Sequence, residues 1–210
     1  MRRLFMLSLA AFFLLVACND TKKPDDANST KAINRYLAKH GQACVFIGQT
    51  FPIDVTESDQ SSQYGIAPEM AALEQAGLVH TRNTTAVVHG MLDALQGPTP
   101  PQPVKRYDLT DEGKEYFRQT ADILDTNGEF CYGEKVVDSI VKWTEPMTTG
   151  PSSESKVTYK YKLVNLAAWA EQLGMQRAFP DIRTTIVGAS KTDQIAGLQL
   201  TNKEWEVPEQ

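Results

Sequence analysis

The sequence is poor in the residues that carry much of enzyme chemistry. Its 210 residues include three histidines, His40, His80 and His89, and three cysteines. The histidines are far apart, and neither an HExxH pattern nor a paired His/Cys zinc pattern occurs, so no metal site and no cofactor is predicted. No CxxC spacing occurs, so a thioredoxin-like redox role has no support.

Recognisable nucleophile motifs are also missing. GxSxG does not occur, and the GASKT stretch at residues 188–192 lacks the glycine and lysine spacing of a phosphate-binding loop, so it is interpreted as a turn. Ser153 and Lys156 match an SxxK spacing, but they lie in a Gly-Pro-Ser-Ser loop without the companion SDN and KTG motifs. Several carboxylates fall in predicted loops or at predicted helix starts, where helix capping or solvation accounts for them. They are Asp54, Glu57, Asp59, Asp108, Asp111 and Glu112. No catalytic residue is therefore predicted.

One apolar run is present, at the N-terminus. Residues 4–17 form a stretch of fourteen in which only Ser8 is polar, and Arg2 and Arg3 precede it. As a helix it would rise about 21 Å, short of the roughly 30 Å hydrocarbon core of a bilayer. A cationic start followed by a short apolar region is the layout of a secretory signal.

The run ends at Leu15-Val16-Ala17-Cys18. These four residues resemble the lipobox of bacterial lipoproteins, whose cysteine is thioether-linked to diacylglycerol and becomes the N-terminus after cleavage. The resemblance implies a signal peptide at residues 1–17 and a lipid on Cys18, whose acyl chains, at about 0.8 kcal/mol per buried CH₂, give stable anchoring. The alternative is an ordinary secretory signal in which Val16 or Ala17 serves a general signal peptidase.

The mature chain is expected to be acidic. Removal of residues 1–17 takes away Arg2 and Arg3 and moves the formal charge from −5 to −7. Nucleic-acid binding needs a concentrated basic surface, so no nucleic-acid partner is predicted. Resemblance to Gram-negative lipoproteins implies that an aspartate after the lipidated cysteine retains a protein in the inner membrane. Asn19 stands there, so we expect a periplasmic protein anchored to the inner leaflet of the outer membrane.

With Cys18 assigned to the lipid, Cys44 and Cys131 remain. In an oxidising periplasm the default for such a pair is a disulfide. Closing a loop of about 87 residues would restrict the unfolded chain by roughly 4 to 5 kcal/mol in the entropic description. Two buried free thiols are the alternative.

An α+β fold is predicted for the mature chain. Residues 18–30 are expected to be a lipidated N-terminus and a disordered tether with a reach of roughly 20 Å, because residues 19–30 hold no apolar side chain except Ala27. Residues 31–125 are expected to be mainly helical, and residues 126–210 a small antiparallel sheet with one helix. One continuous α+β domain is the alternative.

Local patterns place the elements. Helices are expected at residues 31–41, capped by Ser29 or Thr30 and ended by a left-handed Gly41, and at 67–79, 111–124 after Thr110, and 166–174. Strands are expected at residues 44–55 with a turn, 84–92, 104–109, 136–143, 156–164, 183–189 and 196–207. In the strand at residues 156–164, Val157, Tyr159, Tyr161 and Leu163 are expected to face the core.

Two phrases, LEQAGLV at residues 73–79 and YDLTDEGKEYF at residues 107–117, resemble a winged-helix unit of small bacterial transcription regulators. The resemblance covers residues 64–120 and implies a helix, a β-hairpin wing and a further helix. In an exported acidic chain without a basic recognition helix, we expect such a unit to act as a scaffold or protein-binding surface.

These observations favour a non-catalytic envelope lipoprotein. It is expected to bind membrane lipid through Cys18 and a second envelope protein through its folded part. The alternative is a hydrolase that acts on cell-envelope material. A deep pocket that brings together serine, histidine or paired carboxylates would favour the hydrolase.

Overall fold

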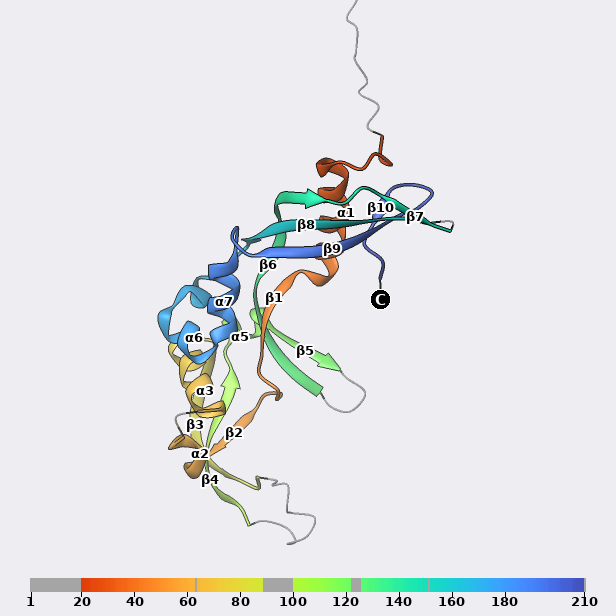
Figure 1. Cartoon of the computed structure of the whole chain (residues 1–210). Helices are drawn as coiled ribbons and strands as arrows, with labels where there is room; N and C mark the ends of the chain where they lie inside the picture. Colours follow the sequence, from red (N-terminus) through yellow and green to blue (C-terminus); the bar gives the residue numbers. More distant parts are fainter. Residues whose placement is uncertain (1–19, 63, 89–99, 122–125, 151, 210) are drawn as a thin grey trace, which may run out of the picture.

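The computed structural model describes residues 20–62, 64–88, 100–121, 126–150 and 152–209. Helices and antiparallel strands follow one another along the chain, so the predicted α+β class is confirmed. The strands form a seven-stranded sheet and a three-stranded sheet. Figure 1 shows the larger, curled sheet across the upper part of the molecule and the smaller one at the lower end. No helix of the described ranges combines the length and apolar character needed to cross a membrane.

The large sheet has the order β1-β6-β8-β9-β10, with β5 beside β6 and β7 beside β8. β6 pairs with β1 along one edge and with β5 and then β8 along the other. The sheet is larger than the small one expected and reaches outside residues 126–210. Its strands are β1 (Gln42–Phe46), β5 (Phe117–Ala121), β6 (Thr126–Trp143), β7 (Met147–Thr149), β8 (Ser152–Val164), β9 (Asp193–Leu200) and β10 (Trp205–Glu206).

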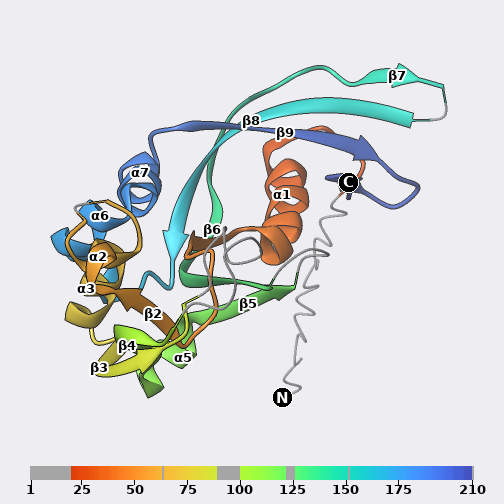
Figure 2. The same ribbon diagram turned by 90° about the horizontal axis from the view of Figure 1, so that it is seen from below.

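Helix α1 (Asp26–His40) packs against this sheet. Figure 2 shows it inside the curve made by β6, β8 and β9. Its buried residues Ala32, Ile33 and Leu37 join a hydrophobic core with side chains of β6, β8, β9 and β10. Three of the predicted inward residues of β8, Val157, Tyr159 and Tyr161, are buried in that core as expected, and Leu163 is partly buried against it.

The structure corrects both ends of this first helix. Asp25 caps α1 by accepting a hydrogen bond from the Asn28 N–H, so residues 26–30 are helical and do not belong to a disordered tether. Gly41 has φ −94° instead of a left-handed conformation. A Cβ at Gly41 would lie 3.0 Å from the Lys135 carbonyl oxygen, so the glycine permits the close approach of β6.

The C-terminal segment, residues 204–209, forms ion pairs with α1. Lys31, Arg35 and Lys39 are four residues apart, so they lie on one face of the helix. Lys31 and Arg35 contact Glu204 at 2.9 and 2.7 Å, and Lys39 contacts Glu209. The hydrogen bond from Arg35, followed by that from Lys31, lowers the pKa of Glu204 from 4.5 to about 2.

This lowered pKa predicts a defined pH dependence. The Glu204 carboxylate stabilises the folded state above its unfolded pKa near 4.5, and that contribution disappears as the pH falls toward 2. Glu204→Gln is therefore expected to lower the thermal midpoint at neutral pH, with the difference from wild type closing between pH 4.5 and 2. Thermal melts across that range measure it. Glu145→Gln, outside these ion pairs, serves as the control, and a pH-independent difference would contradict the assignment.

A second core lies around the three-stranded sheet and the C-terminal helices. The sheet has the order β2-β4-β3, and Figure 1 shows α2 and α3 beside it. Met70, Leu73 and Leu78 are fully buried, and Gly77, two residues after the end of α3, has φ +79°. The elements are β2 (Ile53–Thr56), α2 (Glu57–Gln60), α3 (Ile66–Gln75), β3 (Val79–Ala86), β4 (Gln102–Leu109), η1 (Ala168–Glu171), α6 (Leu173–Ala178) and α7 (Pro180–Gly188).

Both cores combine residues from either side of position 125. The core around the three-stranded sheet includes Val55 and Trp169, and the core around α1 includes Ile33 and Trp205. The two cores therefore do not follow the division at residues 125 and 126 that the local patterns suggested.

Several local expectations are wrong where tertiary contacts override propensity. Of the strand expected at residues 183–189, residues 183–188 belong to helix α7, because Pro180 and Asp181 start a helix and Ile182 and Ile186 pack on one face. The helix expected at residues 166–174 does not end at Gly174, because Gly174 lies inside α6. Leu173, the first residue of α6, is exposed. The strand expected at residues 84–92 begins earlier, at Val79, and residues 89–92 lie outside the described ranges.

Helix α5 (Asp111–Tyr116) begins as predicted but ends much sooner. Thr110 accepts a hydrogen bond from the Gly113 N–H and donates one to the Gly77 carbonyl. The expected helix at residues 111–124 stops at Tyr116, because Phe117 continues as β5 and packs edge-on against Phe51. Residues 122–124 lie outside the described part of the chain.

Gly113 is expected to tolerate no side chain. A Cβ there would overlap the Leu78 carbonyl group, which is main chain and cannot move aside easily. Gly113→Ala should therefore lower the free energy of unfolding by about 1 to 3 kcal/mol in urea titrations. Gly174→Ala is the matched control, because its Cβ would lie 3.5 Å from Gln75 Oε1. Equal effects of the two substitutions would contradict the close contact.

Candidate binding site

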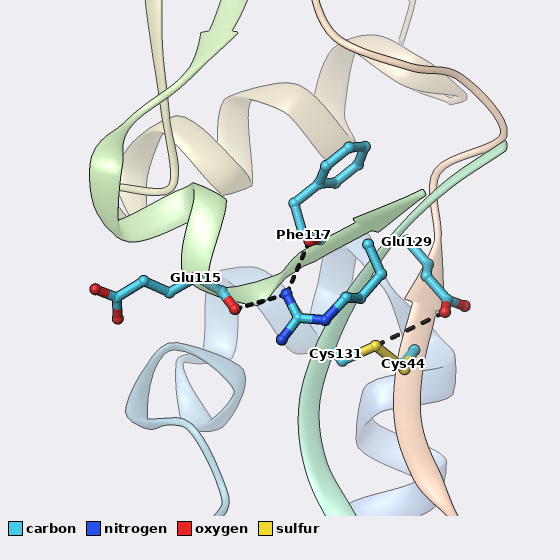
Figure 3. Close-up of a disulfide and its surroundings, with 6 residues drawn as sticks. Cys44, Glu115, Phe117, Glu129 and Cys131 are labelled. Atoms are coloured by element: carbon cyan, nitrogen blue, oxygen red, sulfur yellow. Dashed lines mark hydrogen bonds between the residues drawn. A yellow bond between two sulfur atoms is a disulfide. The ribbon is translucent and has the colours of Figure 1, made fainter. Parts of the chain in front are cut away.

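The predicted disulfide is present. Cys44 on β1 and Cys131 on β6 are cross-strand partners, and their sulfurs are bonded across 87 residues of sequence. Figure 3 shows the bridge with the Glu129 side chain directed toward it. Arg118 on β5 donates hydrogen bonds to the main-chain carbonyls of Glu115 and Phe117 at 2.8 and 2.9 Å. Cys18, the predicted lipid-bearing residue, lies outside the described residues.

One metal-like cluster occurs within the described ranges. Cys44, Glu129 and Cys131 place their potential ligand atoms within 4.8 Å of one another. A cysteine binds a metal as a thiolate, and both sulfurs are used in the disulfide. In the oxidised protein this cluster is therefore a structural crosslink beside a carboxylate.

The SxxK pair does not form a catalytic arrangement. Ser153 and Lys156 both lie on β8, and residues three apart in a strand point to opposite faces of the sheet. The Ser153 hydroxyl lies 3.2 Å from that of Thr148 on β7. Ser153 therefore helps to hold β7 against β8. Strand β8 already begins at Ser152, so Ser152 and Ser153 belong to the strand and not to the loop predicted from Gly-Pro-Ser-Ser.

The two histidines within the described residues, His40 and His80, are both exposed at the surface. His40 stacks on Tyr36 with ring centroids 4.5 Å apart, and His80 is exposed on β3 opposite Asp108. His89 lies outside the described residues. The GASKT stretch is a turn, as predicted, in which the Thr192 N–H donates to the Gly188 carbonyl at 2.8 Å.

The carboxylates singled out in the sequence serve local structure. Both Asp54 oxygens accept hydrogen bonds from Arg106 at 2.6 Å, and Asp108 lies 3.3 Å from Arg82. These pairs cross the three-stranded sheet. Asp59 accepts from Thr56 at the start of α2, Asp111 pairs with Lys114 on α5, and Glu57 and Glu112 lie in first helical turns.

The structure reveals a groove that no sequence motif indicated. It is a cavity of about 570 Å³ at the outer end of the large sheet, between the β7–β8 hairpin, β9 and the C-terminal segment. Apolar surface forms most of its wall. Its lining consists of Thr144, Met147, Glu154, Ser155, Lys156, Gly197, Leu198, Gln199, Val207 and Pro208.

Hydrogen bonds fix the shape of this groove. Ser155 donates to the Thr144 carbonyl at 2.8 Å, and the Lys156 N–H donates to the Thr144 hydroxyl at 2.9 Å. On the neighbouring strand, Gln199 donates to the Ser152 hydroxyl at 2.8 Å. These contacts hold the irregular link between β6 and β7 against β8. The groove is therefore built into the sheet.

The chemistry of the groove suits binding. Met147 is 72% exposed at its edge, and Leu198 is buried at its floor. Among the described residues that line it, Glu154 and Lys156 are the ionisable ones. Methionine adapts its shape to an apolar partner, and one acid with one base gives modest polar selectivity.

Sequence reasoning missed this groove because its parts are distant in the chain. Residues 144–156 and 197–208 are brought together by the pairing of β8 with β9, and Met147 alone, after Pro146, carries no distinctive pattern. Comparisons of the chain with protein-family models, with curated proteins and with solved structures found no match.

Proposed function

We propose that the chain is a lipid-anchored periplasmic lipoprotein that binds another envelope protein and is not itself a catalyst. The groove beside Met147 carries this proposal, because a fixed, mainly apolar surface depression with an exposed methionine is typical of a protein interaction site. The LVAC motif supplies the anchor on Cys18, and Asn19 favours the outer membrane. The acidic mature chain favours a protein partner over nucleic acid.

We also propose that residues 64–120 form a winged-helix-like unit used as a scaffold. Three features support it. Helix α3 leads through Gly77 into the β3–β4 hairpin, and β2 completes the sheet in the order β2-β4-β3. Thr110 and Gly113 then place the start of α5 in contact with Gly77 and Leu78, the residues that follow α3. Charged side chains on this sheet, Asp54 and Arg82 among them, are engaged in ion pairs.

Site-specific photocrosslinking tests the groove. A photoreactive residue at Met147 in living cells is expected to give a discrete adduct with an envelope protein. Leu173, 69% exposed on α6, is the matched control position and should give none. Gly197→Leu should abolish the adduct, because no atom lies within 4 Å of its new Cβ and the side chain fills open space. Equal crosslinking at both positions would refute the groove as the binding site.

Lipid labelling tests the anchor. Wild-type protein is expected to incorporate labelled palmitate and to fractionate with the outer membrane. Cys18→Ala should lose the label entirely, because the thioether is formed by that sulfur. An unlabelled wild type would overturn the lipoprotein assignment, and inner-membrane fractionation would overturn the sorting inferred from Asn19.

A further inference from the structure

The segment that precedes α1 is bound to the body of the protein. The Thr21 hydroxyl donates to the Lys203 carbonyl at 2.7 Å, and the Trp205 indole donates to the Lys22 carbonyl at 3.0 Å. Asn28 donates from its side chain to the carbonyls of Asp20 and Lys23, at 2.8 and 3.0 Å. The segment is therefore held on two sides, by α1 and by the hairpin of β9 and β10.

The groups that hold the segment are buried. Asn28 is 5% exposed and Trp205 is 3% exposed. Releasing residues 20–23 would leave the indole N–H and the Asn28 amide without these acceptors. Ordered structure thus extends back to Asp20, whereas residues 19–30 as a free tether would have reached roughly 20 Å.

This docking has a consequence for the membrane, and it rests on the proposed lipid at Cys18. Asn19 alone lies between Cys18 and Asp20, and an extended chain spans at most about 3.3 to 3.6 Å per residue, so the two steps from Cys18 to Asp20 cover about 7 Å at most. We infer that the bilayer surface contacts a fixed face of the domain, the anchoring face, formed by residues 20–23 and the turn at residues 201–203.

The orientation of the molecule follows from this contact. Figure 1 shows the segment after residue 20 at the top of the molecule and the three-stranded sheet at the bottom, and Figure 2 views the molecule along that direction. With the anchoring face on the membrane, β2, β3 and β4 point into the aqueous space. The groove lies closer to the membrane, because Val207 and Pro208 follow directly after β10.

Charge does not dominate this contact. Exposed Lys22, Lys23 and Lys203 lie at the anchoring face together with exposed Asp20, and exposed Asp26 follows in the first turn of α1. Three cations against these two anions leave one net positive charge, which attracts anionic headgroups only weakly. The lipid chains and the short link therefore set the orientation, and it should be the same on anionic and zwitterionic bilayers.

Energy transfer to labelled lipids tests the inference. Full-length acylated protein is reconstituted in phosphatidylethanolamine vesicles, with or without phosphatidylglycerol, that contain an acceptor-labelled headgroup lipid. A donor dye is attached at Asn202→Cys on the anchoring face, or at Thr85→Cys on β3; both positions are exposed. Mass mapping first verifies that Cys44 and Cys131 remain paired in each variant. Strong transfer from residue 202 and weak transfer from residue 85 are expected in both lipid mixtures.

A lengthened link is the matched control. A Gly-Ser insertion of about twelve residues between Asn19 and Asp20 gives a reach of roughly 20 Å and should reduce the difference between the two positions about two-fold or more. Equal transfer from both positions before insertion, no effect of the insertion, or dependence on headgroup charge would overturn the anchoring face. Protein that carries no acyl mass and does not float with vesicles would instead overturn the lipid on Cys18, so the two failures are distinguishable.

Discussion

Reduction of the Cys44–Cys131 disulfide is expected to lower the free energy of unfolding by about 4 kcal/mol. The bridge closes a loop of 87 residues and joins the edge strand β1 to its neighbour β6. It therefore restricts the unfolded chain strongly, while in the folded state the two strands remain paired without it. Urea titration of wild type with and without reductant measures the effect.

The double variant Cys44→Ala/Cys131→Ala is the control for this experiment. It should unfold near the midpoint of the reduced wild type, and reductant should leave it unchanged. A wild-type midpoint that does not respond to reductant, with complete reduction verified by mass, would contradict the expected crosslink.

Trp169→Ala is expected to lower the free energy of unfolding by about 3 to 5 kcal/mol, the range for truncating a buried aromatic residue. Trp169 on η1 lies at the centre of an aromatic cluster and packs edge-on against Tyr116, Phe130 and Tyr132, with centroid separations of 5.7, 6.3 and 5.9 Å. Its removal would open a cavity between β6 and the C-terminal helices. Urea unfolding followed by circular dichroism measures the loss.

Trp169→Phe distinguishes the contribution of the aromatic ring to stability from that of the polar indole N–H. The indole Nε1 is buried and has no hydrogen-bond partner among the described residues. A buried donor without a partner costs about 1 to 3 kcal/mol, so phenylalanine removes that cost while it keeps one aromatic ring. We expect it to destabilise the protein far less than alanine. Equal losses for the two variants would show that the second ring, and not the orphan N–H, dominates.

Local chemistry determined several elements from the sequence alone. Thr110 caps a helix because its hydroxyl accepts from a nearby N–H, and Gly77 follows α3 because glycine adopts positive φ without strain. The alternation of Val157, Tyr159 and Tyr161 placed them in the core because strand side chains alternate between faces. Cys44 and Cys131 were identified as a pair by elimination, after the resemblance to a lipobox assigned Cys18.

Other elements were decided by contacts between distant residues. The β-branched stretch at residues 183–189 favours a strand locally, but burial of Ile182 against the core makes it a helix. Phe117 ends α5 because its ring packs with Phe51 and Phe130, which belong to two other segments. Local propensities amount to fractions of a kcal/mol per residue, so burial of one large side chain outweighs them.

The sequence by itself determined the α+β class, the cysteine pair and the candidate anchor, because each depends on composition or on residues adjacent in the chain. The tertiary structure alone decided the groove and the docking of residues 20–23. The groove needs residues 144–156 beside residues 197–208, and the docking needs Trp205 and Lys203 beside Lys22 and Thr21. Both arise from strand pairing and burial between segments far apart in the chain, which a local pattern does not encode.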